Sequence, residues 1–240
     1  MKIKSSYLVC ATPRSGSSYL CGLLANTKIA GNPEEYYWKD NILDGYKKWK
    51  VNDFAGYFKK SLEAGSTYNR VFGAKIMWGY IDDFIQRLKK ITRSNFSSDK
   101  LLFEFYFPNL KFIYIWRKDF VAQAVSWTIA SQTGIWFSGS NNKPDKKPKY
   151  NFQIINNLVK EIKTHNKAWN DWFTENQITP LKIKYEDLDI HTNKVMIGVM
   201  NLLDLDLPSD TAIKASYKRQ TDSIKKEWTQ RFLSEQKTSY

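Results

Sequence analysis

The chain has 240 residues, of which 42% are hydrophobic, enough for a sizeable core. No run approaches 18 apolar residues, so we expect no membrane span, and the short polar start at residues 1–6 shows no secretion signal. The formal net charge of +13 favours anionic partners and leaves both a nucleic acid and a small phosphorylated ligand open. We therefore expect one α/β domain over residues 1–240, located in the cytoplasm.

Strands and helices are predicted to alternate along the chain. An apolar run at 7–11 ends at Thr12-Pro13 and predicts a buried strand, and apolar residues at helical spacing follow over 16–25. The same criteria predict strands at 71–76, 110–116 and 180–184 and helices at 81–88, 119–131 and 152–173, before a helical C-terminal region that begins at 196–203 and ends in a basic stretch at 214–231. This alternation predicts a mostly parallel sheet with helices on both faces.

The loop after the first strand, at residues 11–18, reads ATPRSGSS. A nucleotide-binding P-loop has the pattern Gly-x4-Gly-Lys-Ser/Thr at these places. Gly16 is retained, but Ala11 replaces the first glycine and Ser17 replaces the lysine. Backbone N–H groups at the helix start can still hold an anion, with Arg14 as the nearby cation. An ordinary serine-rich helix cap has the same residues, so the loop alone leaves both interpretations open.

A second cation follows the strand at 110–116. Arg117 stands at its carboxyl end, where open α/β sheets bind ligands, and Ser126 lies nine residues on in the next helix. Together they could hold a second phosphate, or Arg117 could pair with Asp119 while Ser126 faces solvent. A kinase needs the P-loop lysine and an acidic residue for Mg²⁺. Since this chain lacks that lysine and has Arg117 in place of the acid, we expect an anion handled without a metal.

In combination, these motifs resemble the sulfotransferases that use 3′-phosphoadenosine 5′-phosphosulfate (PAPS). Further motifs narrow the resemblance to the bacterial trehalose 2-sulfotransferase-like family. They are Gly31-x-Pro33-x-Glu35, Gly73-x-Lys75-x-Met77-Trp78, Gln123-Ala124-Val125-Ser126, Trp172-Phe173-Thr174-Glu175 and Arg219-Gln220.

The resemblance implies a P-loop-type sulfotransferase fold, PAPS as co-substrate, no metal, a sugar-containing acceptor and a homodimer. Within the donor site it implies three groups of residues. Arg14, Ser15, Gly16, Ser17 and Ser18 would face the 5′-phosphosulfate, Arg117 and Ser126 the 3′-phosphate, and Arg219 and Gln220 would close the nucleotide pocket. Arg14, with Lys75, would stabilise the transferring group and the leaving phosphate.

An alcohol is a poor nucleophile, so we expect a general base. The resemblance places the family's catalytic carboxylate at Glu35, which precedes aromatic residues whose rings would desolvate it and raise its pKa. His165 falls on the apolar stripe of the helix at 152–173, which indicates a packing role, and His191 is expected at a helix start.

Four aromatic residues are candidates for contact with the acceptor, with core packing as the competing interpretation. They are Tyr36, Trp38, Trp78 and Trp136. Departures from the family around this segment, such as Asn32, leave trehalose, a glycolipid, another sugar and a non-sugar alcohol open as acceptors. The alternative functions are a P-loop small-molecule kinase and a basic nucleic-acid-binding protein, although no nucleic-acid-binding motif is present and we expect no nucleic-acid partner.

Overall fold

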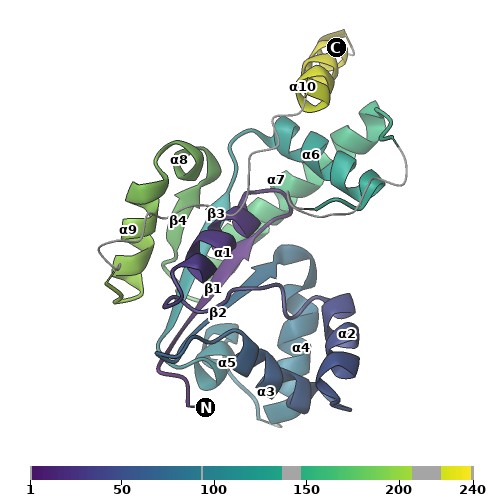
Figure 1. Ribbon diagram of the computed structural model, residues 1–240. Coiled ribbons are helices and arrows are strands. Elements are labelled where there is room, and N and C mark those ends of the chain that lie inside the picture. Colours follow the sequence, from purple (N-terminus) through teal and green to yellow (C-terminus); the bar gives the residue numbers. More distant parts are fainter. Residues whose placement is uncertain (1, 93, 137–146, 207–222, 239–240) are drawn as a thin grey trace.

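The structure is a computed structural model that describes residues 2–92, 94–136, 147–206 and 223–238. Its centre is a parallel sheet with the strand order β2-β1-β3-β4 (Figure 1). The strands are β1 (Ser5–Ala11), β2 (Val71–Met77), β3 (Leu110–Trp116) and β4 (Leu181–Lys184). β1 is central, and its residues are almost all buried because helices cover the sheet on both sides. All four strands predicted from the sequence are confirmed.

Helices follow every strand. They are α1 (Ser17–Asn26), α2 (Lys39–Trp49), α3 (Phe54–Ala64), the 3₁₀ turn η1 (Trp78–Tyr80), α4 (Ile81–Thr92), α5 (Asp99–Tyr106), α6 (Phe120–Thr133), α7 (Phe152–Glu175), α8 (Tyr185–Ile190), α9 (Thr192–Leu202) and α10 (Ser223–Thr238). The expected helices are confirmed, whereas α2, α3, α5 and α8 were not predicted. Residues 214–222 of the expected basic stretch lie outside the described residues. Across the described ranges, no helix is long and apolar enough to cross a membrane.

Opposite faces of the sheet carry different chemistry. Leu8 of β1 pairs in register with Phe112 of β3. The ring of Phe112 packs against Trp172 of α7, with ring centroids 5.9 Å apart. The neighbouring residue Val9 points to the other face and pairs with Lys75 of β2, whose side chain reaches α1. The α7 face is therefore an aromatic core, while the α1 face carries a buried cation toward the carboxyl edge.

A smaller apolar cluster joins α6, α7 and α10. Val125 of α6, Ile162 of α7 and Trp228 of α10 are buried together, and Phe152 stacks on Phe232 with ring centroids 4.8 Å apart. Figure 1 shows α10 lying against α6, away from the sheet. This packing holds α6 beside the loop that follows β1.

The carboxyl ends of all four strands meet at one edge because the sheet is parallel. The chain leaves β1 for β2 on one side and later returns to β3 on the other side of β1. Such a change of direction marks the usual ligand position in open α/β sheets, which here is the edge between β1 and β3. The loop after β1 and Arg117 after β3 border it.

Candidate active site

The loop from β1 to α1 has a backbone shape suited to an anion. Arg14 has φ 63° and Gly16 has φ 90°, both left-handed. Gly16 is the N-cap of α1, where no side chain caps the helix and no acidic residue occupies the first turn. The N–H groups of that first turn are therefore available to a negative ligand. Gly16 is required for a second reason, since a Cβ there would lie 2.3 Å from the ring of Tyr185.

Side chains of α6 and α7 form hydrogen bonds to this loop and hold it in place. Trp169 Nε1 donates to the Ala11 carbonyl at 2.9 Å. Gln123 Nε2 donates to Thr12 Oγ1 at 3.0 Å and to the Pro13 carbonyl at 2.7 Å. Thr12 Oγ1 in turn donates to Asn166 Oδ1 at 3.4 Å. These contacts were not predicted from the sequence, although Asn166, a polar residue between apolar positions of this helix, was a signal for them.

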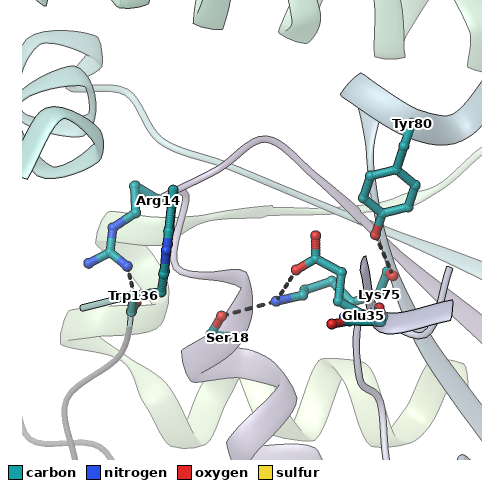
Figure 2. A network of polar contacts seen from close by, with 7 residues as sticks. Arg14, Ser18, Glu35, Lys75, Tyr80 and Trp136 are labelled. Carbon is teal, nitrogen blue, oxygen red and sulfur yellow. Dashed lines mark hydrogen bonds and ion pairs between the residues drawn. The ribbon is translucent and has the colours of Figure 1, made fainter. Parts of the chain in front are cut away.

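Arg14 turns toward α6 rather than into solvent. Its Nε donates to Ser126 Oγ at 3.0 Å. Its Nη1 donates to the carbonyl of Trp136, as Figure 2 shows. Burial lowers the pKa of Arg14, and the nearby Arg117 guanidinium lowers it further. The structure thus brings Arg14, Ser126 and Arg117 into one group, with Ser126 bonded to Arg14.

Arg117 does not pair with Asp119 in the part of the chain that is described. The Asp119 side chain instead accepts from the Ala122 N–H and caps α6. The Arg117 guanidinium lies over the ring of Tyr185, 4.9 Å from the centroid. Its Nε is buried and has no hydrogen-bond partner among the described residues, and the same holds for the hydroxyl of Ser15. Buried polar groups are normally satisfied, so these two atoms fit a ligand that supplies acceptors and donors.

Lys75 brings a third cation to the start of α1 from β2. Its Nζ donates to Ser18 Oγ at 3.1 Å and forms an ion pair with Glu35 Oε2 at 3.0 Å (Figure 2). The residue is only 7% exposed. Burial is the largest single influence on the pKa of Lys75 and lowers it, but Glu35, Cys21 and Glu34 together raise it by more, so the net pKa is raised and the ammonium is charged at neutral pH. Lys75 therefore supplies the cation that position 17 lacks.

Glu35 is held at this point by backbone contacts. The Lys75 N–H donates to the Glu34 carbonyl at 2.9 Å, which aligns this segment with β2. The Asn41 side chain donates to the Glu35 carbonyl at 2.6 Å. Glu34 is exposed over much of its surface, although burial of part of its side chain raises the pKa of its carboxyl, whereas the Glu35 carboxylate forms the ion pair with Lys75. From the sequence only aromatic neighbours were expected for Glu35, and its ion pair with the Lys75 ammonium was not predicted.

The two histidines lie elsewhere. His165 is on α7 with Nε2 4.0 Å from Glu161, and burial lowers the pKa of its imidazole. His191 is the N-cap residue of α9, as expected. Among the described residues, the ion-pair partner of Lys75 beside the loop is therefore Glu35 and not a histidine.

The four candidate acceptor residues differ in exposure. Tyr36 is 8% exposed and its hydroxyl donates to the Asn32 carbonyl at 2.8 Å, so its ring is part of the core. Trp78 packs edge-on against Trp169, with centroids 5.2 Å apart. Trp38 and Trp136 are 42% and 43% exposed and offer open ring surface.

Trp38 also lies 5.6 Å from the ring of Tyr80, whose hydroxyl donates to the Lys75 carbonyl at 3.2 Å. Arg219 and Gln220 lie outside the described residues. Within the described ranges, no cluster of three or more His, Cys, Asp or Glu side chains is arranged to hold a metal. Cys10 and Cys21 are buried free thiols.

Residues 6–235 match the family model described as Stf0 sulphotransferase. Over 253 residues the chain is 26% identical to trehalose 2-sulfotransferase of Mycolicibacterium smegmatis, with 95% of this chain and 94% of that protein covered. It is also 26% identical over 258 residues to trehalose 2-sulfotransferase of Mycobacterium tuberculosis, with the same coverage.

Two solved structures are also similar. One is the sulfotransferase domain from the curacin biosynthetic pathway, with a TM-score of 0.46, 13% identity and 99% of each chain covered. The other is the sulfotransferase domain from the Synechococcus PCC 7002 olefin synthase, with a TM-score of 0.46, 12% identity, and 98% of this chain and 89% of that chain covered.

Proposed function

The chain belongs to the Stf0 sulphotransferase family, and on that premise we propose that it transfers a sulfuryl group from PAPS to a hydroxyl of a carbohydrate or glycolipid. The observation that supports this donor best is the grouping of Arg14 and Arg117 beyond the carboxyl ends of β1 and β3. Two guanidiniums held close together repel each other, and partial burial adds to that cost unless an anion compensates them. A nucleotide with phosphate at both its 3′ and 5′ positions supplies that compensation.

We assign the two ends of the donor as follows. The first-turn N–H groups of α1, Arg14 and Lys75 would hold the 5′-phosphosulfate, since all three lie at the start of the helix. Arg117 would bind the 3′-phosphate together with Ser126. Ser126 Oγ already accepts from Arg14 Nε, and its own proton could be donated to the phosphate.

Glu35 would act as the general base. Its carboxylate takes the proton of the acceptor hydroxyl as that oxygen bonds to sulfur, and the bond from sulfur to the 5′-phosphate oxygen breaks. The phosphate leaves with the electron pair, so the products are a sulfate ester and 3′-phosphoadenosine 5′-phosphate. Proton uptake removes the charge of Glu35 and thereby frees the Lys75 ammonium to stabilise the leaving phosphate. By analogy with phosphoryl transfer, positioning and preorganised charge would supply most of the rate enhancement.

The acceptor would lie on the exposed side of Glu35. Trp38 and Trp136 offer open rings, the apolar surface that ligand sites combine with a few polar groups. The relatives named above are trehalose 2-sulfotransferases, so trehalose and its glycolipids are the first acceptors to test.

A direct test incubates the purified protein with PAPS and, separately, trehalose, a trehalose glycolipid, glucose and a simple alcohol. Mass spectrometry measures the sulfated product, and chromatography measures release of the bisphosphate. We expect bisphosphate release that depends on a sugar-containing acceptor. Turnover with the simple alcohol and with none of the sugars would refute the carbohydrate assignment, and absence of PAPS binding by calorimetry would refute the donor assignment.

A further inference from the structure

Tyr185 occupies a position between the two anion-binding elements. It is the first residue of α8, directly after β4. One contact of its ring is with Gly16, at the start of α1, where an added Cβ would lie 2.3 Å from Cδ2 of the ring. Another is with the guanidinium of Arg117, 4.9 Å from the ring centroid. The ring therefore separates Gly16 of the loop after β1 from the cation that follows β3.

The Arg117 guanidinium needs such a neighbour. Its Nε finds no hydrogen-bond partner among the described residues, and Arg14 places a second positive charge nearby. Without a bound anion, repulsion from Arg14 would push Arg117 toward solvent. The negative face of an aromatic ring attracts a guanidinium and so opposes that movement.

The next residue of the chain anchors the same region. The carboxylate of Glu186 accepts from the Lys118 N–H at 3.1 Å and from the Asp119 N–H at 3.3 Å. These are the two backbone groups that follow Arg117. The junction of β4 and α8 thus holds the turn after β3 by its backbone through Glu186, and the Arg117 side chain through Tyr185.

We propose that Tyr185 is a positioning residue that holds Arg117 beside the phosphate loop and so sets the spacing of the two cationic ends of the donor site. Because the ring contacts both Gly16 and Arg117, we assign it as a spacer between them and not as a surface on which the nucleobase stacks. The assignment rests on the proposed function, since it concerns how the bisphosphate nucleotide is bound.

The test combines two measurements on the full chain. Calorimetry gives the Kd of 3′-phosphoadenosine 5′-phosphate and of AMP for the wild type, Tyr185→Phe, Tyr185→Leu, Arg117→Ala and the double variant Tyr185→Leu/Arg117→Ala. NMR of ¹⁵N-arginine-labelled protein without nucleotide gives the Arg117 Nε–H resonance, which is assigned by its loss in Arg117→Ala. Tyr185→Phe is the matched control because it keeps the ring.

We expect Tyr185→Leu to weaken bisphosphate binding about 3- to 30-fold, as for a lost cation–π contact, and to change AMP binding less than about twofold. Tyr185→Phe should stay near the wild-type Kd. In the Arg117→Ala background, Tyr185→Leu should have no further effect, because residues that act as a unit are not additive. The Arg117 resonance should show a ring-current shift that Tyr185→Phe keeps and Tyr185→Leu loses.

Three results would overturn the assignment. They are an equal loss for AMP and the bisphosphate, additive effects in the double variant, or a wild-type Arg117 resonance without a ring-current shift. The ring-current shift of the wild-type Arg117 resonance can be measured even if Tyr185→Leu does not fold. A wild-type protein that keeps the ring-current shift but does not bind the bisphosphate would support the role of Tyr185 and refute the proposed donor.

Discussion

Glu35→Gln separates the two roles that the structure gives this carboxylate. The amide is nearly isosteric but cannot accept a proton at neutral pH, so kcat should fall by about 10²–10⁴, the usual range for a lost general base. Glu34→Gln is the matched control, because Glu34 is exposed while the Glu35 carboxylate contacts Lys75. That control should change kcat less than about threefold, because the interactions of an exposed charge are worth less than about 1 kcal/mol.

The same substitution should tighten product binding. Glu35 Oε2 lies 3.0 Å from Lys75 Nζ and offsets its charge. Removing that carboxylate leaves the ammonium free for the 5′-phosphate, and a partly exposed ion pair is worth about 1 kcal/mol. The Kd of 3′-phosphoadenosine 5′-phosphate should therefore fall roughly 3- to 10-fold. A variant with lower kcat and tighter product binding is unusual, which makes the combination a sharp test.

Stability should change with pH in a defined direction. The folded-state pKa of Lys75 is raised above its unfolded value, so the ion pair stabilises the fold fully below about pH 10 and is lost as pH rises through the folded pKa. Glu35→Gln should thus lower the unfolding free energy by about 1 kcal/mol at pH 7 to 9, and the difference should shrink above about pH 10.5.

Steady-state kinetics, calorimetry and denaturant unfolding give the three quantities. The reasoning fails if Glu35→Gln weakens bisphosphate binding, since Glu35 would then not compete with the ligand for Lys75. It also fails if Glu35→Gln stays active while His165→Asn or His191→Asn abolishes turnover in a folded, PAPS-binding protein.

Three further predictions concern the donor site. Arg117→Ala should weaken bisphosphate binding by about 1.5–3 kcal/mol and leave AMP binding almost unchanged in calorimetry, whereas an equal loss for both ligands would give Arg117 a purely structural role. Turnover should persist in excess chelator because Arg14, Lys75 and the start of α1 supply positive charge to a sulfuryl group that carries less charge than a phosphoryl group, and loss of activity that Mg²⁺ restores would contradict this. Gly16→Ala should lower stability by about 2–4 kcal/mol, since it combines a left-handed backbone with a clash on Tyr185. Thermal unfolding would detect that loss, and Gly79→Ala, where nothing lies within 4 Å of the new Cβ, should leave the midpoint within a few degrees.

Much of the fold could be predicted because its strands are short apolar runs. Tyr7–Ala11 of β1 and Phe112–Ile115 of β3 are buried on both faces, so these stretches are apolar without interruption. Two of the missed helices start at a single capping residue. The start of α3 depends on one side chain, Asp53, which accepts from the Gly56 N–H at 2.7 Å, and α5 depends in the same way on Ser98. Such short helices are stabilised by packing on the core more than by their own periodicity.

The candidate site could likewise be predicted only in part from the sequence. The loop that carries Arg14 and Gly16 is continuous in sequence, so its resemblance to an anion-binding loop could be seen from the residues alone. The partners of that loop could not, because they depend on the strand order. β2 lies beside β1, which places Lys75 next to Ser18 although 57 residues separate them. Placing Tyr185 likewise requires knowing that β4 lies beside β3.

The replacement of the P-loop lysine by Ser17 shows why position in space matters more than position in the motif. An ammonium in the loop would start from α1, whereas Lys75 reaches the same helix end from β2 and brings Glu35 with it as a charge partner. A cation paired with the base is partly neutralised until the base takes up a proton. In the proposed reaction, its full charge then becomes available as the leaving phosphate gains negative charge. The pairing thereby links proton transfer to stabilisation of the leaving group, which a lysine in the loop without an acidic partner could not do.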